Sequence, residues 1–438
     1  MDTVTQVVEA MDTVLNATAE AAGEQSGFVQ RRSKLTGARF VQTLVFGWLK
    51  NPQASLEELT QTTAALGVRL SPQGLDQRFG PKAAAALEQV LNAAVTEVIA
   101  AQPVAIPLLQ RFSSVALLDS STVVLPDALA QIWSGNGSRT GQGAAALKFQ
   151  MRLDLCTGAL SGPLIQDARC HDRTSPLQKT ELPPGSLRIA DLGYFSLDVL
   201  RDMAQQEVFF LSRLQVQTLV FAQDGRGLDL PKVLRAQASG PIDLEVYIGN
   251  NHRLPVRLLA AAVDPGVARE RRRKLKLEAR RRCQPVSKKR LALAGWTILV
   301  TNVPPELLTL EEALVLARAR WQIELLFKLW KQHGQIDEWR TQKPWRILCE
   351  VYAKMLAMLI QHWLLLVSCW TYPDRSLVKG AQTVRGYALM LASAMAGDIQ
   401  MTAVLGVLGR TLSSGCRMNS RRGKPNAYQL WLDPTGGA

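Results

Sequence analysis

The sequence predicts a mixed α/β protein in which a strand-rich middle is flanked by two helical regions. Residues 1 to about 105 and those after about 340 contain few strand-like runs, whereas short apolar runs typical of strands begin near residue 112. The chain has 438 residues, of which 47% are hydrophobic, so it can bury more than one core. These observations indicate two or three structural units.

A large excess of positive charge indicates a polyanionic partner. The chain has 51 Lys and Arg against 37 Asp and Glu, which gives a net charge of +14. Nucleic acid is the first candidate, since each cation that docks on a phosphate releases counterions. An anionic membrane surface is a weaker candidate, because the basic segments lack the apolar face of a membrane-surface helix.

The sequence also predicts a protein of the cytoplasm. Six scattered cysteines without a CxxC pair are typical of a reducing compartment and do not have zinc-site spacing. The polar, acidic N-terminus does not resemble a signal peptide. The most apolar run, residues 355–369, is short for a membrane span and predicts a buried core helix.

Residues 1–105 are predicted to form a helical, DNA-binding region. Ser55 and Glu58 form a capping box that opens a helix, Gly67 ends that helix, and Ser71 begins a second one. Two short helices across a Gly turn resemble a helix-turn-helix, but an ordinary helical hairpin has the same pattern. DNA binding and a purely structural role therefore both remain open for this hairpin.

Residues 106–214 carry the first predicted strands. Apolar runs bounded by turn residues predict strands at 114–118, 147–155, 187–190 and 208–214. The second of these alternates apolar and polar residues, as in a half-buried strand, and follows a glycine-rich hairpin tip at 135–143. The first strand ends on Asp119 and the third on Asp191. Two carboxylates are therefore expected at strand ends.

Residues 215–300 are predicted to be a β-rich insertion of short strands and turns. Near its end, residues 269–290 contain twelve Lys or Arg against two Glu. One interpretation is a solvated, mobile basic loop. The other is a strip that follows a phosphate backbone.

Residues 314–331 predict a helix that is apolar on most faces yet carries one charged stripe. At about 100° per residue, Arg320, Glu324, Lys328 and Lys331 fall within one narrow sector. Such a helix is usually buried, and burying charges costs several kcal/mol unless they are paired or used. Pairing at four-residue spacing accounts for Glu324, but it leaves the burial of the stripe unexplained.

Three carboxylates are candidates for a metal site. Asp119 and Asp191 follow strands, and Glu324 lies on a helix that follows the last strand. Hard cations such as Mg²⁺ prefer carboxylate oxygens, and two such ions about 4 Å apart support in-line displacement at phosphorus. An aspartate at a strand end is, however, most often a turn or cap residue.

These residues carry a family resemblance. The spacing Arg320-(3)-Glu324-(6)-Lys331 resembles the Y-(2)-R-(3)-E-(6)-K signature of bacterial transposases of the insertion-sequence-four family. Residues 117–122 and 189–195 resemble the segments that carry the two catalytic aspartates of that family. The resemblance covers residues 112 to 335 well. One position differs, because the tyrosine of the signature is replaced by Ala317.

The resemblance implies a ribonuclease H-like catalytic core interrupted by the β-rich insertion. The core would comprise residues 106–214 and 301–345, and residues 346–438 would form a helical C-terminal region that ends in a basic tail at 417–424. Asp119, Asp191 and Glu324 would bind two Mg²⁺ ions, which Mn²⁺ could replace, and carry out catalysis.

The implied reaction is DNA transposition. The enzyme would cleave one strand at the transposon end, form a hairpin, reopen it and join the end to target DNA. Arg320, Lys328 and Lys331 would hold the terminal phosphates. The partners would be double-stranded DNA, with terminal inverted repeats and target, and a second copy of the chain, in the bacterial cytoplasm at the nucleoid. The C-terminal region is where we expect the dimer contact.

Two further residues have two interpretations each. Trp296 lies 28 residues before Glu324, where relatives stack a flipped base on a Trp, but it could equally be a strand-core residue. Arg213 could bind a phosphate or simply lie on the surface.

Two other functions remain as alternatives. A DNA-binding regulator derived from a transposase, with its chemistry lost, is favoured only by Ala317. A ribonuclease H-like nuclease for repair or resolution is the other alternative, and it leaves the helical ends and Trp296 less expected.

Overall fold

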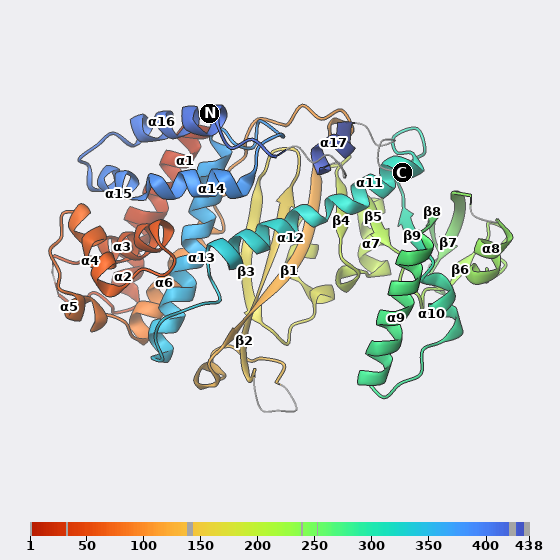
Figure 1. Cartoon of the computed structure of the whole chain (residues 1–438), viewed down its shortest axis with the longest axis horizontal. Helices are drawn as coiled ribbons and strands as arrows, with labels where there is room; N and C mark the ends of the chain where they lie inside the picture. Colours follow the sequence, from red (N-terminus) through yellow and green to blue (C-terminus); the bar gives the residue numbers. More distant parts are fainter. Residues whose placement is uncertain are drawn as a thin grey trace. The chain divides into compact units, whose positions relative to one another are not determined.

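The computed structural model describes residues 2–31, 34–137, 143–237, 240–251, 253–419 and 426–432 (Figure 1). It has two compact units, each built from three segments of the chain. The first unit takes Met1–Ala105, Asp119–Cys170 and Trp321–Lys424, and the second takes Ile106–Leu118, His171–Arg320 and Pro425–Ala438. The predicted hairpin tip at 135–143 and the basic tail at 417–424 lie partly outside the described residues.

Among its described residues, the first unit has α12 (Trp321–Lys328) and ten further α-helices, of which α13 is buried. They are α1 (Thr3–Asp12), α2 (Ala19–Gln25), α3 (Gly37–Lys50), α4 (Leu56–Ala65), α5 (Pro72–Asp76), α6 (Pro81–Ala94), α13 (Pro344–Leu366), α14 (Leu377–Gly386), α15 (Ala388–Ala396) and α16 (Met401–Ser414). A π-helical segment, Thr13–Thr18, joins α1 to α2. α13 packs against α3 and α6 (Figure 1). N-terminal and C-terminal sequence therefore share one core.

α13 confirms the prediction of a buried core helix. Among the described residues it is the one helix long and apolar enough to cross a membrane, and its whole apolar window is buried inside the protein. The charged pair inside it is also buried: the ammonium of Lys354 lies 2.8 Å from the Glu350 carboxylate and donates to the carbonyls of Gln335 and Glu338. These bonds satisfy the charges that burial would otherwise leave unpaired.

The predicted capping box at α4 is confirmed. The Glu58 amide donates to the Ser55 hydroxyl, and the Glu58 carboxylate accepts from the Ser55 amide. The second helix of the predicted hairpin, α5, has only five residues, Pro72–Asp76.

The strands form one hydrogen-bonded order, β3-β2-β1-β4-β5-β9-β8-β7-β6. The strands are β1 (Val115–Leu125), β2 (Ala145–Asp154), β3 (Leu160–Asp167), β4 (Leu187–Ala190), β5 (Phe209–Arg213), β6 (Val220–Phe221), β7 (Ile242–Ile248), β8 (Leu254–Ala262) and β9 (Trp296–Thr301). β4 is parallel to both β1 and β5, whereas β5 and β9 begin a series of antiparallel pairs. Because β1 belongs to the second unit up to Leu118 and to the first from Asp119, each unit contains its own part of this order.

The alternation predicted for residues 147–155 holds in β2, with one exception. The apolar residues of the strand are buried, but Gln150 is buried too. Its side-chain amide donates to the Gln166 side chain on β3 at 2.9 Å. A cross-strand hydrogen bond therefore lets a polar residue occupy the interior.

The segment from 215 to 300 contains helices as well as the expected strands. They are α8 (Leu230–Ala236), α9 (Pro265–Arg281) and α10 (Lys288–Leu293). The interpretation of residues 269–290 as a basic loop is therefore wrong for most of its length. Asp264 caps α9, Pro265 takes its first position, and Arg, Lys, Leu and Ala are strong helix formers.

Stability of the first unit should depend on pH through His362. This side chain is buried in α13, its Nε2 lies 2.7 Å from the Gly158 carbonyl, and burial lowers its pKa to about 4. The unfolded chain, with an ordinary pKa near 6.5, binds a proton that the folded chain rejects. We expect the free energy of unfolding to fall by roughly 1.4 kcal/mol for each pH unit from about 6.5 down to about 4 because of this group.

Urea unfolding across that pH range measures the effect, with His362→Gln as the comparison. The glutamine can donate to Gly158 but does not titrate, so its unfolding free energy should vary less steeply with pH. Parallel pH profiles for the two proteins would contradict the assignment.

Candidate active site

Asp119 lies within a strand and not at its end. β1 continues to Leu125, so the prediction that the strand stops at Asp119 is wrong. The apolar pattern resumes at Val123 after four half-buried polar residues, and β2 remains a neighbour of β1. The pairing of β1 with β4 does end near Asp119, because Leu118 is the last residue of β1 that pairs with β4.

The two aspartates occupy equivalent places on their strands. Leu118 of β1 and Ala190 of β4 are partners in the parallel register, and Asp119 and Asp191 are the next residues of their chains. The Asp119 carboxylate accepts a hydrogen bond from the Ser120 amide at 2.8 Å. Asp191 has an extended backbone, and its carbonyl accepts from the Tyr194 amide at the start of a short 3₁₀ turn.

The predicted helix over 314–331 is interrupted. The structure has α11 (Leu310–Ala319), α12 (Trp321–Lys328) and a π-helical segment, Leu329–His333. Arg320 stands between the first two with right-handed helical dihedral angles, φ −50° and ψ −28°. Arg320 therefore keeps a helical backbone conformation, although it belongs to neither α-helix.

Arg320 approaches the second aspartate. Its guanidinium Nε lies 3.9 Å from Oδ1 of Asp191, and both side chains are partly exposed. Glu324 follows Arg320 by four residues, or about one helical turn, in the first turn of α12. The arginine of the Arg320-(3)-Glu324 spacing therefore pairs with the second aspartate.

The charged helix is not buried on all its apolar faces, contrary to the prediction. Trp321 is 48% exposed and Leu325 40% exposed, while Ile323, Leu326 and Phe327 are buried. The ammonium of Lys328 lies 4.2 Å from the centre of the Trp321 ring, which attracts the charge. The opposite face packs on β2, where Phe149 contacts Phe327 and Trp330.

Lys331 is bound to β1. Its ammonium donates to the Thr122 carbonyl at 2.7 Å and lies 3.9 Å from the Asp337 carboxylate. Thr122 is three residues beyond Asp119 on the same strand. The last cation of the signature is therefore tied to the strand of the first aspartate, a contact that spacing alone did not predict.

Two arginines hold the connection that leads from β9 to α11. Arg257 is buried, pairs with Asp243, and donates to the carbonyls of Val303 and Leu308 at 2.8 and 3.0 Å. Arg111 donates to the Leu307 carbonyl and makes a bidentate bond to Glu312. Sequence reasoning missed both, because Arg111 and Glu312 lie 201 residues apart and no local pattern marks them.

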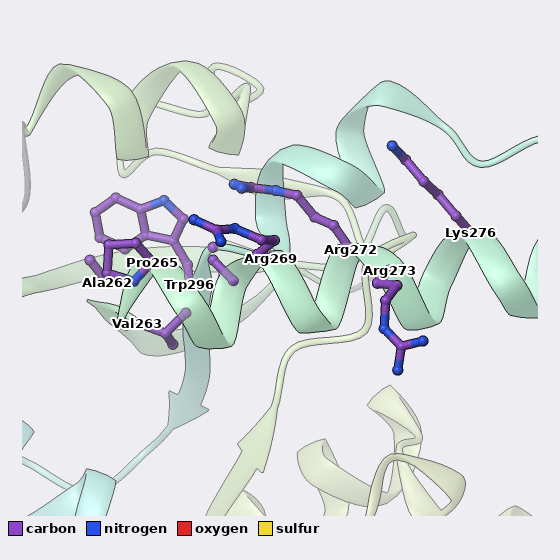
Figure 2. Close-up of a pocket in the computed structure, with 10 residues that line it drawn as sticks. Ala262, Val263, Pro265, Arg269, Arg272, Arg273, Lys276 and Trp296 are labelled. Carbon is purple, nitrogen blue, oxygen red and sulfur yellow. The ribbon is translucent and has the colours of Figure 1, made fainter.

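Trp296 and the basic helix α9 line one pocket of the second unit, with a volume of about 720 Å³ (Figure 2). Trp296 is half-buried at the start of β9, and its carbonyl accepts a hydrogen bond from Arg271 at 3.1 Å. Arg213 ends β5, where it pairs in register with Leu299 of β9. Burial, and secondarily the charge of Arg213, lower the pKa of Arg271.

The donor chemistry of the three carboxylates fits a hard divalent cation, since all of them offer oxygen ligands. Asp119 and Glu324 belong to the first unit and Asp191 to the second. Over the described ranges of the chain, no three His, Cys, Asp or Glu side chains form a group that could hold a metal ion.

Paired parallel strands that lead into two aspartates, one of them in contact with Arg320, fit the class of α/β enzymes that catalyse metal-assisted phosphoryl transfer. Residues 110–360, well over half of the chain, match the transposase DDE domain family. The match includes every element that carries the site.

Relatives give the same result. The transposase for insertion sequence element IS231C of Bacillus thuringiensis subsp. berliner is 30% identical over 362 residues, which cover 78% of this chain and 75% of the relative. The transposase for insertion sequence element IS1151 of Clostridium perfringens is 23% identical over 77% of this chain and 75% of its own. A putative transposase for IS186A of Escherichia coli K12 is 28% identical over 50% of this chain and 61% of its own.

The chain therefore belongs to the family of DDE transposases of bacterial insertion sequences, as the resemblance predicted. It is an enzyme of DNA cleavage and strand transfer. Membership implies a ribonuclease H-like fold and a general dependence on divalent metal ions.

Proposed function

We propose that this transposase cleaves DNA at the ends of its insertion element and joins them to target DNA by two-metal-ion phosphoryl transfer, through a hairpin intermediate. The observation that carries the proposal is the position of Asp119 and Asp191 directly after the Leu118–Ala190 pair of two parallel strands. Asp119, Asp191 and Glu324 would be the catalytic metal ligands.

The register supports a common site for the two aspartates. Neighbouring parallel strands carry their residues forward in step, so side chains that follow one paired position emerge at the same edge of a sheet. Ligands in open α/β sheets bind at the carboxyl ends of parallel strands. Asp191 follows the carboxyl end of β4, and Asp119 follows the last residue of β1 that pairs with β4.

The ion pair between Arg320 and Asp191 supports the third ligand. Arg320 precedes Glu324 by four residues, so the sequence motif that contains Glu324 also contains the arginine that pairs with Asp191. The chemistry that two Mg²⁺ ions, or Mn²⁺ in their place, supply when bound is activation of the attacking oxygen and stabilisation of the leaving one.

The cations of the helix would hold DNA phosphates. Arg320 can grip a phosphate with two parallel hydrogen bonds, whereas Lys328 and Lys331 act as point charges. Lys328 is exposed, and its contact with the Trp321 ring keeps its ammonium at the surface. Lys331 is ordered by Thr122, so its charge is held near the strand of Asp119.

Two residues of the second unit would contact the DNA hairpin. Trp296 is half-buried beside a pocket lined by arginines, which suits stacking of a flipped base and offsets part of the cost of unstacking. Arg213 is exposed at the end of β5 and would bind a neighbouring phosphate.

The regions outside the core would bind the partners. Residues 1–105 would recognise the terminal inverted repeat, residues 215–300 would serve as the insertion, and residues 346–438 would contact a second copy, since bringing two ends together requires at least two protomers. The reaction would take place on the nucleoid in the bacterial cytoplasm.

A regulator that binds DNA without cutting it is the second candidate. It is favoured by Ala317, which occupies the position of the signature tyrosine. Sequence-specific DNA binding without cleavage in Mg²⁺ or Mn²⁺ would support this candidate and overturn the first.

Cleavage of a linear duplex that carries the ends of the element tests the proposed chemistry. In Mg²⁺ or Mn²⁺ the wild type should nick the duplex at the end, and Asp119→Asn should reduce the rate by at least about 10²-fold, because it removes a charged metal ligand. Asp202→Asn, at an exposed residue of α7 (Leu197–Gln205), is the matched control and should cleave as the wild type does. Equal rates for all three proteins would contradict the assignment.

The role of Arg320 is tested by comparing two neighbours in the chain. Arg320→Ala should lower the cleavage rate by about 10²- to 10³-fold, the effect of removing one preorganised donor. Arg318→Ala removes the same charge from an exposed position of α11 and should leave the rate within a factor of about two. Similar losses in both variants would indicate that only overall charge matters.

A further inference from the structure

The basic helix α9 of the second unit is fixed to its surroundings. Ala268 is buried, and Arg271 donates to the Trp296 carbonyl. Arg272 donates from Nε to the Leu291 carbonyl of α10 at 3.1 Å. The Asp264 carboxylate accepts from the first amides of the helix. Arg272 remains exposed although its Nε is bonded to Leu291, and Arg269, Lys276 and Arg280 are exposed as well.

The outward charges of α9 are not spread evenly. At about 100° per residue, Arg269, Arg272, Lys276 and Arg280 fall within one sector of roughly 80°, which we call the α9 stripe. Both acids of the helix, Glu270 and Glu278, lie outside that sector. In Figure 2, Arg269 and Arg272 extend toward the Trp296 indole, whereas Arg273 points to the other side of the helix.

The pairing of charges follows the same division. Glu270 forms a bidentate bond with Arg273 and lies 3.9 Å from Lys274, and Glu278 pairs with Arg282. By contrast, Arg269, Lys276 and Arg280 make no ion pair with any residue that the structure describes. An uncompensated row of cations raises the local positive potential, which favours an extended anion over a single small one.

We propose that the α9 stripe binds the phosphate backbone of double-stranded DNA, independently of sequence. This rests on the proposed function, which makes DNA the substrate. Between Arg269 and Arg280 the helix rises by about 16 Å. A DNA strand has one phosphate per about 3.4 Å of helix axis, so the stripe runs past roughly five phosphates.

The site lies beside the Trp296 pocket, so α9 would hold the backbone of the duplex whose nucleotide approaches that tryptophan. Arg272 and Trp296 line the same pocket, and a Cβ at Gly295 would come within 3.1 Å of the Arg272 guanidinium. The glycine thus leaves room for an arginine next to the indole. Backbone contacts of this kind set the position of a protein on DNA, and they do not read its sequence.

The salt dependence of DNA binding tests the proposal. The test variant is Arg269→Gln with Lys276→Gln, and the control is Lys274→Gln with Arg281→Gln, which removes the same two charges from the other side of α9. Binding of the full chain to a duplex of unrelated sequence is measured over a range of salt concentrations without divalent metal, so that no cleavage occurs. Equal thermal midpoints for the two variants establish that both are folded.

The proposal expects the slope of log K against log salt to become shallower by up to about 1.8 in the test variant, about 0.9 for each phosphate that the variant no longer neutralises. The control should keep the wild-type slope. Equal slopes in all three proteins, equal reductions in both variants, or a reduction seen with single-stranded but not double-stranded DNA would overturn it. If the wild type binds no DNA, the proposed function is overturned as well. If the wild type binds DNA and the test variant has the same salt slope, only the phosphate-binding role of the α9 stripe is overturned.

Discussion

The parallel pairing of β1 with β4 is the constraint on which the candidate site depends. Only four residues of β1, Val115–Leu118, pair with β4, and the register leads directly into Asp119 and Asp191. A shift of one residue would turn each side chain to the opposite face of its strand. Buried Leu117 and Ile189 oppose such a shift, because it would expose apolar side chains that are now in the core. The burial of these strands therefore also fixes where the carboxylates emerge.

A second constraint is the set of charged contacts that join distant parts of the sequence. Arg257 and Arg111 hold the connection before α11, Arg320 reaches Asp191, and Lys331 bonds to the Thr122 carbonyl. Each contact lies next to one of the three acidic motifs or on the path to it. Charged hydrogen bonds to carbonyls have a fixed geometry and are stronger than neutral ones. Within the first unit, the Lys331 bond fixes the segment that follows Glu324, while the exposed Trp321 and Lys328 remain open to a polyanion.

Local patterns predicted much of the fold, and long-range contacts account for what they missed. The capping box of α4, the alternation of β2 and the buried α13 follow from signals within one segment. The extension of β1 past Asp119 could not be predicted, because β2 remains its neighbour after β4 ends. The break at Arg320 and the exposure of Trp321 likewise depend on tertiary surroundings. For the site, the motif spacing identified the candidate residues, but spacing alone could not pair Lys331 with Thr122.

The proposed function requires Asp119, Asp191 and Glu324 to act as one divalent metal site. The affinity for Mn²⁺ can be measured by electron paramagnetic resonance, without relying on cleavage. Mn²⁺ is titrated into the full chain bound to duplex DNA that carries the element's end. Alanine at any one of the three positions should weaken Mn²⁺ binding by at least about tenfold, as expected when a metal ligand is removed. Wild-type Mn²⁺ affinity in Asp191→Ala would rule out a shared site, since that residue could not then bind the same ion as the other two.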